Sequence, residues 1–375
     1  LPPSQIDSAM PGAGIPLEGD EEIEVEVEEE EVEPSEIIEN EDGSVVLDFN
    51  SVVKEELLAE HDANLADGLD ERLLMDLGNE LINLYEEDKE SRQEWENSYS
   101  EGLKLLGLKY EERDQPFRGS SGVTHPVIAE AVTQFQAQAY KELLPADGPV
   151  RTQIIGETTP EVEAQAQRVQ QYMNYQIMHN MQEFDPELDR LLFYLPLAGS
   201  AFKKIYFDET LDRAVSKFIP ADDLVVPYNA TDLFSASRVT HVIRMAENEI
   251  KKLQAGGFYR DISLEPYELD DELREKEREI SGITKTSVDN DCTLIEMHTN
   301  IDLEGYEHTE PMEGTETGIK LPYIVTVDLE SQQILAVRRN WKEGDEYYKK
   351  LEYFAHFKFL PGLGFYGLGL LHMIG

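Results

Sequence analysis

The sequence predicts an α+β fold, in which long N-terminal helices are followed by a mixed, mainly antiparallel β-rich body. Apolar residues recur at intervals of three and four between about positions 69 and 180, which is the spacing of amphipathic helices. Beyond Pro196, short runs rich in β-branched and aromatic residues are separated by polar turns, as in antiparallel sheets. The first fifty or so residues are strongly acidic and show neither pattern, so we expect a disordered acidic N-terminal arm.

Four regions follow from these patterns. We predict a disordered acidic arm over 1–52, a helical region over 53–150, a mixed α/β body over 151–260, and a charged helix with β-hairpins over 261–375. Within the arm, the segment from Asp20 to Glu33 is almost entirely Glu, Val and Ile, and it cannot bury enough apolar area to offset its ordering entropy. Within this segment Glu alternates with Ile and Val, which would also suit an edge strand that pairs with a partner protein, but a solvated arm is favoured.

Three helical stretches are expected. The first begins near Leu69 and is one long amphipathic helix or two in series; the second begins at Pro126, and the third follows Thr159 and ends near Asn180. The first is marked by Leu74, Leu77, Leu81, Leu84, Trp95, Tyr99, Leu103 and Leu106. The second has a predicted buried face of Ile128, Val132, Phe135, Ala139 and Leu143, and the third carries Val162, Ala166, Val169, Met173 and Ile177 on one face.

The second half of the chain predicts mostly strands. A β-hairpin is expected from 202–207 and 214–219, with further strands over 224–227 and 238–245 and a helix over 246–256. A charged, exposed helix is predicted over 270–280. Four more strands are predicted over 292–300, 321–328, 333–339 and 351–359, the middle two joined by a short polar turn.

The charge balance disfavours a protein that binds DNA tightly. The 375 residues include 78 Asp and Glu against 32 Lys and Arg, a formal net charge of -46. A surface of this sign repels phosphates, because it removes the counterion release that drives non-specific binding to nucleic acids. It suits a channel past which DNA slides, although it does not by itself demonstrate one.

The number of cysteines and the hydropathy pattern limit the cellular compartments in which we expect this protein. Cys292 is the only cysteine, which excludes an intrachain disulfide and a four-thiolate zinc site and fits a reducing compartment. There is no apolar run of transmembrane length and no basic-then-apolar leader, so we expect a soluble, unsecreted protein. The chain opens on Leu1 and stops on Gly375 directly after an apolar stretch, so we expect it to be a piece of a longer protein.

The most suggestive local motif is GLGFYG at 362–367, which has the glycine spacing of a dinucleotide-binding turn and follows a predicted strand. Pro361 interrupts the strand-to-turn junction, and Phe365 and Tyr366 crowd the last glycine. A packed glycine-rich turn that leads into a helix through Gly369 and His372 is therefore favoured over a nicotinamide-dependent oxidoreductase. No Walker-type phosphate loop occurs in the sequence.

Histidines and acidic residues suggest no metal site. No two histidines are spaced three or four apart on a helix, so His125, His241, His298 and His356 are interpreted as core or interface residues. Asp222, Asp223 and Asp232 lack the alternating carboxylates and central glycine of a calcium loop, so they are interpreted as turn residues.

Serines and basic pairs are equally unspecific. Ser200 lacks the second glycine of a nucleophile elbow, and Ser120 and Ser121 lie in a glycine-rich loop near His125 without forming a triad signature. The basic pairs at 203–204, 251–252, 338–339 and 349–350 are short and scattered, so a solvated face or an intersubunit salt bridge is favoured over a nucleic-acid groove. We predict no catalytic, cofactor-binding or metal-binding residue and no cofactor.

Longer segments are more distinctive than any of these motifs. They are LLGL at 105–108, EER at 111–113, PFRG at 116–119, THP at 124–126, AVTQFQA at 131–137, LPLAGSAFKK at 195–204, PADDLVVPY at 220–228, RVTH at 238–241 and LPGLGFYGLG at 360–369. In this order they resemble portal proteins of short-tailed bacteriophages, of the P22-like and related marine kind. The resemblance covers roughly residues 84–375 and leaves the acidic arm out.

The resemblance implies a structural subunit and no enzyme. It implies a dodecameric ring at one capsid vertex, with these residues mostly in the wing and part of the stem, which forms the channel for DNA packaging and ejection. Implied partners are the terminase, tail adaptor or head-completion proteins, the major capsid or scaffolding protein, and double-stranded DNA that passes without sequence-specific binding; no membrane is involved. The implied location is the virion, and the host cytoplasm during assembly. An acidic binding or chaperone-like module without catalytic activity is the alternative.

Overall fold

In the computed structural model of the chain, the described residues are 60–106, 126–208, 211–264, 276, 278, 291–310 and 316–374, together with the strands β1 (Glu36–Glu39) and β2 (Val45–Asp48). The chain divides into two compact units, Leu1–Lys54 and Glu55–Gly375. The predicted helix over 270–280 lies outside the described residues except for two positions, and so does the predicted disordered arm except for β1 and β2.

The smaller unit contains an antiparallel strand pair that the sequence interpretation missed. β1 and β2 pair from Glu36 opposite Asp48 to Glu39 opposite Val45. The prediction of disorder is therefore wrong for these eight positions. The missed signal is the dipeptide Asp42-Gly43 between two short apolar runs, which is a strong hairpin-turn pair.

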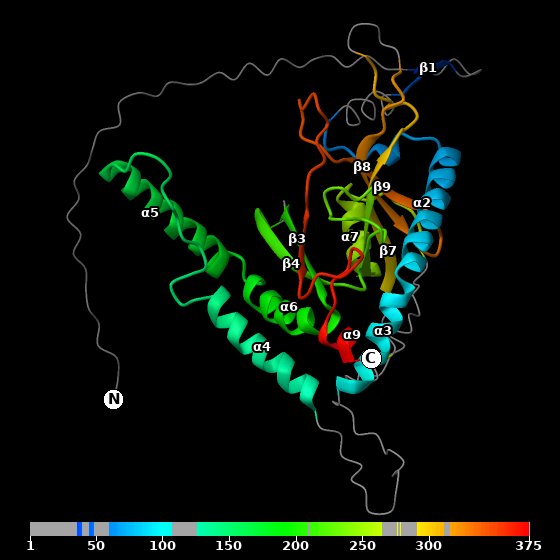
Figure 1. The fold of residues 1–375 in the computed structure, drawn as a ribbon. Coiled ribbons are helices and arrows are strands. Elements are labelled where there is room, and N and C mark those ends of the chain that lie inside the picture. Colours follow the sequence, from blue (N-terminus) through cyan, green and yellow to red (C-terminus); the bar gives the residue numbers. More distant parts are fainter. Residues whose placement is uncertain are drawn as a thin grey trace, which may run out of the picture. The chain divides into compact units, whose positions relative to one another are not determined.

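The larger unit is α+β with antiparallel sheets, as predicted (Figure 1). A five-stranded sheet has the order β5-β6-β7-β8-β9, with β5 at Leu224–Val225, β6 at Arg238–Ala246, β7 at Asp291–Ile301, β8 at Leu321–Asp328 and β9 at Ile334–Arg339. A three-stranded sheet has the order β10-β3-β4, with β10 at Phe354–Lys358, β3 at Ser200–Asp208 and β4 at Arg213–Pro220. Both sheets combine strands from the predicted 151–260 and 261–375 regions. The predicted hairpin of β3 and β4 and the predicted pairing of β8 with β9 are confirmed.

Helices lie around these sheets (Figure 1). They are α2 (Glu71–Ser91), α3 (Gln93–Leu103), α4 (Val127–Leu143), α5 (Pro160–Tyr175), α6 (Phe184–Ala198), α7 (Glu247–Ala255) and α9 (Leu370–Ile374). Short turns are η1 (Leu65–Asp67), η2 (Lys104–Leu106) and the π-helical η3 (Gln176–Asn180). None of the helices in the described part of the chain is both long and apolar enough to cross a membrane.

Two helix predictions need correction. Helix α6 was not predicted. Pro186 lies in its first turn, where proline is tolerated, whereas Pro196 lies in its last turn and removes one backbone hydrogen bond without ending the helix before Ala198. Its buried residues Leu188, Leu191, Leu192 and Leu195 have clear helical spacing. Helices also do not simply precede strands, since β1 and β2 come before all described helices and α7 lies between β6 and β7.

Helix α2 illustrates how the sequence forms the main core. The Asp70 side chain accepts a hydrogen bond from the Arg72 amide at 2.8 Å and caps the helix start. Leu74, Leu77 and Leu81 then recur on one face and pack against apolar side chains of the five-stranded sheet. Each such leucine stabilises the fold by about 2 kcal/mol on burial.

The segment before α2 lies along β9, the edge strand of the five-stranded sheet. The Asn64 amide donates to the Leu335 carbonyl oxygen at 3.0 Å, and its Oδ1 accepts from the Val337 amide at 3.0 Å. One side chain thus imitates the backbone of a neighbouring strand. This contact blocks further strand pairing at that point of β9.

Helices α4 and α5 are less covered than their sequences suggested. On α4, Ile128 and Val132 are buried as predicted, whereas Leu143 is 52% exposed, so that part of the predicted buried face is wrong. Helix α5 has the predicted apolar face but not a single buried residue. The described residues of the larger unit therefore leave an apolar stripe of α5 uncovered.

Candidate functional site

Arg92 lies between α2 and α3, and its guanidinium is buried among backbone groups. Its Nη atoms donate to three carbonyl oxygens, those of Asp222, Ala221 and Leu224, at 2.7, 2.8 and 3.0 Å. The side chain is about 1% exposed, so these bonds form away from water. A buried guanidinium that is not fully bonded is costly, hence its partners must be held in place.

Two further side chains complete this arrangement. Glu96, one helical turn further on, forms an ion pair with the Nε atom of Arg92 at 2.7 Å. The Tyr366 hydroxyl accepts from Arg92 at 2.9 Å and from the Val226 amide at 3.1 Å, and donates to the Leu224 carbonyl oxygen at 2.8 Å. We call Arg92, Glu96, Tyr366 and residues 221–226 the Arg92 junction.

An aromatic stack covers the junction. The Trp95 ring stacks on Tyr366 with 4.8 Å between centroids and on His372 with 5.3 Å, and Trp95 Nε1 donates to the Gly367 carbonyl oxygen at 3.2 Å. These contacts join α3 to the turn before α9. The junction is therefore enclosed by apolar rings and excludes water.

The protonation states at the junction are fixed by burial and by pairing. Burial alone would lower the pKa of Arg92, but Tyr366 and Glu96 outweigh it and raise the pKa further above its ordinary value. Burial raises the pKa of the Tyr366 hydroxyl. Arg92 is thus a permanent cation and Tyr366 a neutral donor, which is the pattern of a structural cross-link.

The glycine-rich segment 362–369 packs on this junction. A Cβ on Gly364 would meet the Tyr228 ring at 2.4 Å, and one on Gly367 would meet the Gly199 carbonyl oxygen at 2.3 Å. The space that the glycines leave is therefore filled by other parts of the chain. This geometry favours the packed turn over the dinucleotide-binding turn.

Ser200 and His356 meet in the structure although they are far apart in sequence. The Ser200 hydroxyl lies 3.0 Å from Nε2 of His356 and accepts from the Gly367 amide at 2.7 Å. Ser200 is fully buried, and the His356 ring stacks against Phe202 at 4.4 Å and against Phe365 at 4.7 Å. A substrate cannot reach this serine, so the pair fastens the glycine-rich turn to β3 and β10.

A second polar cluster lies between the two sheets. Lys204 of β3 contacts both carboxylate oxygens of Glu296 on β7, at 2.6 and 2.7 Å, and His298 Nε2 lies 2.9 Å from Glu296 Oε1. Burial would raise the pKa of Glu296, but Lys204 and His298 hold it well below its usual range. The cluster is an ionic clamp between strands of different sheets.

Buried histidines around this clamp predict a loss of stability in acid. Burial, and then Lys204, lower the pKa of His241 to about 4, although Glu296 and Asp223 oppose the shift. Because its unfolded value is 6.5, the unfolded state binds more protons between about pH 6.5 and 4, and stability falls as the pH falls through that window.

We expect His241→Asn to remove about 2 kcal/mol of the stability difference between pH 7.5 and pH 5. The measurement is urea unfolding at both pH values. His179→Asn, at an exposed position, is the control and leaves the difference unchanged. An unaltered difference in His241→Asn would show that folding does not lower the pKa of His241.

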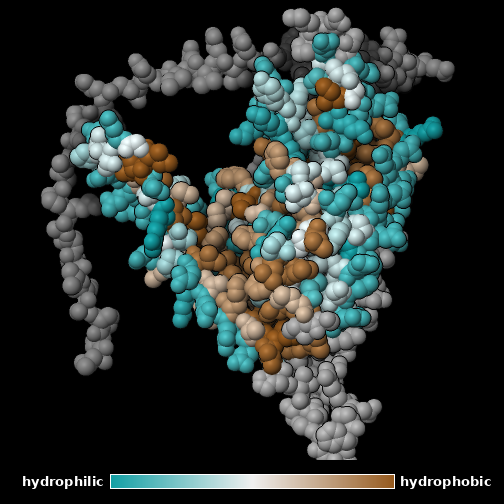
Figure 2. All heavy atoms as spheres, viewed as in Figure 1, coloured by the Kyte–Doolittle hydropathy of each residue, from teal (hydrophilic) through white to brown (hydrophobic). Residues whose placement is uncertain are grey.

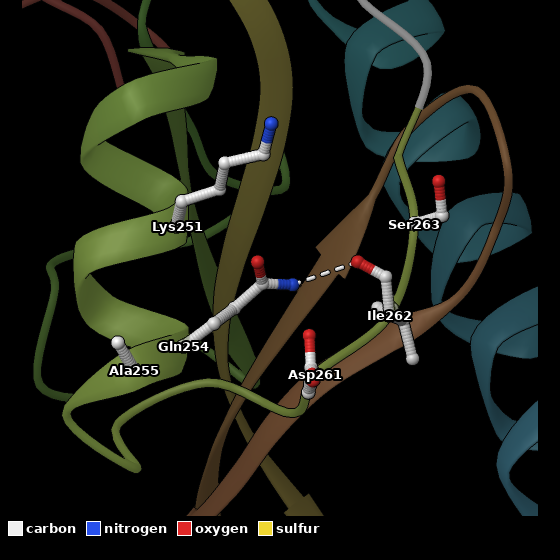
Figure 3. A pocket seen from close by; sticks show the side chains of 6 residues that line it. All are labelled: Lys251, Gln254, Ala255, Asp261, Ile262 and Ser263. Atoms are coloured by element: carbon white, nitrogen blue, oxygen red, sulfur yellow. Dashed lines mark hydrogen bonds between the residues drawn. The ribbon is translucent and has the colours of Figure 1, made fainter.

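One hollow in the described part of the chain lies beside α7 (Figure 3). It has a volume of about 440 Å³ and is lined by Lys251, Gln254, Ala255, Asp261, Ile262 and Ser263. The Gln254 amide donates to the carbonyl oxygens of Arg260 and Ile262 at 2.9 and 2.8 Å, and Lys251 pairs with Glu247 at 2.5 Å. These groups hold the segment after α7 in place and leave no converging set of free polar groups in the described lining.

No protein-family model matches this chain, and no curated protein does. The function has to be inferred from the residues themselves. At the Arg92 junction, segments that are distant in sequence meet around buried polar contacts. We therefore take this junction as the candidate functional site.

The histidines singled out in the sequence lie where core residues were expected. His241 and His298 belong to the polar cluster, and His356 stacks against Phe202 and Phe365, while His125 lies outside the described residues. Among the described residues, no three His, Cys, Asp or Glu side chains are arranged to hold a metal ion.

The three aspartates do not come together as one cage. Asp232 accepts from the Ser235 amide at 2.7 Å, which is the turn role that was predicted. Asp223 instead pairs with Arg244 at 2.8 Å, so the turn interpretation is incomplete for that residue. Asp222 contributes its carbonyl oxygen to the Arg92 junction.

Several of the basic pairs are used inside the chain, which corrects the expectation of a solvated face. Lys203 lies with Nζ 4.0 Å from the centre of the Phe184 ring, and burial lowers its pKa to about 8. Arg339 donates to the Glu60 carbonyl oxygen at 2.9 Å, and Lys350 to the Phe234 carbonyl oxygen at 3.0 Å. The basic groups of these residues are thus engaged with their own chain.

Sequence reasoning missed the role of Arg92. A usable signal exists, because Tyr85, Asp88, Arg92, Trp95 and Tyr99 continue the helical spacing of the buried face. An arginine on such a stripe, with Glu96 four residues later, indicates a buried ion pair. The carbonyl oxygens that accept from Arg92 lie 129 to 132 residues further along the chain, so local sequence spacing could not predict them.

Proposed function

We propose that this chain is a structural subunit of a bacteriophage portal ring, which forms the channel for DNA packaging and ejection and the docking platform for the terminase and for tail or head-completion proteins. The observation that carries the proposal is the ordered series of segments that resemble portal proteins from 105–108 to 360–369. The finer expectations of a portal wing, part of a stem and twelve subunits belong to this proposal.

The Arg92 junction supports a structural role for these segments. Segment 195–204 supplies Gly199 and Ser200, segment 220–228 supplies the carbonyl oxygens around Arg92, and segment 360–369 supplies Tyr366 and the packed glycines. Segment 238–241 adds Arg238, which pairs with Asp88 of α2 at 2.5 Å. The distinctive residues thus brace one joint between helices and sheets, which a load-carrying ring subunit needs.

The charge distribution is consistent with a DNA channel. The chain carries a net charge of -46, and the basic groups described above are engaged with carboxylates, carbonyl oxygens or rings of the same chain. A chain with so large an excess of negative charge repels phosphates, so DNA would pass without being held.

The test is the assembly state of the purified full-length protein. Native mass spectrometry and cryo-electron microscopy at tens of micromolar protein are expected to show closed rings, with twelve copies as the main species. A chain that remains monomeric throughout that range contradicts the portal proposal and favours the acidic binding module. Because contacts of a closed ring are heterologous, an open filament or a simple dimer would also contradict it.

A further inference from the structure

Helix α5 exposes an apolar stripe that the described part of its own chain does not cover. Val169, Tyr172 and Met173 are 44%, 64% and 45% exposed and lie on one side of the helix. Figure 2 shows hydrophobic residues gathered along this helix, and they continue toward α4 and α6. Contiguous exposed apolar side chains on a helix mark an interaction surface more often than a random surface does.

An adjacent side of the helix is already occupied. The Asn174 side chain accepts from the Val150 amide at 2.8 Å and donates to the Val150 carbonyl oxygen at 3.1 Å. The Thr152 hydroxyl donates to the Ala166 carbonyl oxygen at 3.2 Å. Residues 148–152 therefore hold α5 by one side and leave the stripe of Val169, Tyr172 and Met173 for another molecule.

The stripe also lies in a stretch without acidic residues. From Ala164 to Gln182 the chain has no Asp or Glu, although acidic residues make up 78 of the 375 positions. Arg168 is the one residue of that stretch with a permanent charge, and the rest is mainly Gln, Tyr, Met, Asn and Ala. Depletion of acids with enrichment of Tyr and Met is the composition of the centre of a protein interface.

We infer that the α5 stripe, defined by Val169, Tyr172 and Met173, is a contact surface for a second copy of this chain. Two copies with a net charge of -46 repel each other over most of their surfaces, so they can approach only where acids are missing. A basic partner would instead be drawn to the acidic remainder of the surface. The inference rests on the proposed function in so far as a ring needs such a contact, and it names the residues that form it.

The first test changes the stripe and measures self-association. Val169→Glu with Tyr172→Glu introduces two acids at exposed positions of a helix without a buried residue, so the fold is expected to persist, as circular dichroism and thermal melting will report. Sedimentation velocity is expected to show that about tenfold or more additional protein is needed for association.

The matched control is Ile319→Glu with Tyr347→Glu, which changes a β-branched residue and a tyrosine that are 52% and 78% exposed elsewhere. It is expected to associate like the unmodified chain. Equal association of the stripe variant and the control overturns the inference and leaves the portal proposal standing. An unmodified chain that never associates overturns both, and one that forms only a dimer lost in the stripe variant supports the contact but not the ring.

A second measurement does not depend on weakening the contact. Cys292 is fully buried, so Tyr172→Cys supplies one accessible thiol for a polarity-sensitive maleimide dye. Its emission is expected to shift to the blue as unlabelled chain is added, whereas the same dye on Tyr347→Cys stays unchanged. Equal behaviour of the two labelled positions would place the self-contact elsewhere and overturn the inference.

Discussion

Arg92→Leu is expected to lower the free energy of unfolding by about 3–5 kcal/mol, because it breaks a buried ion pair from one side. The substitution leaves the Glu96 carboxylate buried without its cation, and three carbonyl oxygens around the guanidinium lose their donor. Urea unfolding followed by tryptophan fluorescence measures the loss. Trp95 stacks on Tyr366 in the junction, so its emission reports locally.

Arg72→Leu is the matched control, since Arg72 lies on α2 with an exposed side chain, and it is expected to change stability by less than about 0.5 kcal/mol. Arg92→Lys keeps the charge but cannot reproduce the planar fork of donors, so it should lie between the two. Arg92→Leu with Glu96→Leu removes both charges and is expected to recover part of the loss. A loss below about 1 kcal/mol in Arg92→Leu would mean that the junction is hydrated and carries little of the stability.

The sequence predicted those parts of the fold that depend on local spacing. The recurrence of Leu74, Leu77 and Leu81 predicts the buried face of α2. Runs rich in β-branched and aromatic residues predict β3, β4, β8 and β9, which pair as expected. Pairing across short polar turns is local too. These elements required no knowledge of distant residues.

The predictions that failed concern features that depend on tertiary contacts. Helix α6 was not predicted, although Leu188, Leu191 and Leu195 have helical spacing. These leucines pack in the core, and that packing holds the helix despite the proline in its last turn. The apolar face of α5 was correctly placed on one side of a helix, yet periodicity cannot tell whether the same chain or another copy covers it. Whether the apolar face of α5 is buried depends on its tertiary and intermolecular contacts, which local spacing does not encode.

The candidate site was the least predictable part. Arg92, the carbonyl oxygens of 221–224 and Tyr366 are separated by up to 274 residues, and each is unremarkable in its own segment. The glycine spacing of 362–367 was visible, but it matched two opposite interpretations. The contacts of Gly364 with the Tyr228 ring and of Gly367 with the Gly199 carbonyl oxygen favour the packed turn, because they fill the space beside both glycines.

Gly199→Ala is expected to destabilise the larger unit by about 4 kcal/mol through two separate causes. Gly199 ends α6 with a φ of 79°, in the left-handed region that a side chain adopts at a cost of about 1 kcal/mol. A Cβ there would also lie 2.3 Å from the Gly369 nitrogen and 2.3 Å from the Leu368 carbonyl carbon. Backbone atoms cannot turn aside as a flexible side chain does, so the turn before α9 would have to shift, at a further cost of about 3 kcal/mol.

Gly257→Ala separates the two causes. Gly257 has a φ of 71°, close to that of Gly199, but no atom lies within 4 Å of the position of its Cβ. Its alanine variant should therefore lose only about 1 kcal/mol in urea unfolding, and the difference between the two variants measures the close approach of β3 and the glycine-rich turn. Similar losses in both variants would show that the 360–369 segment is loosely packed, and the junction would then not brace α6 against the chain's last described residues.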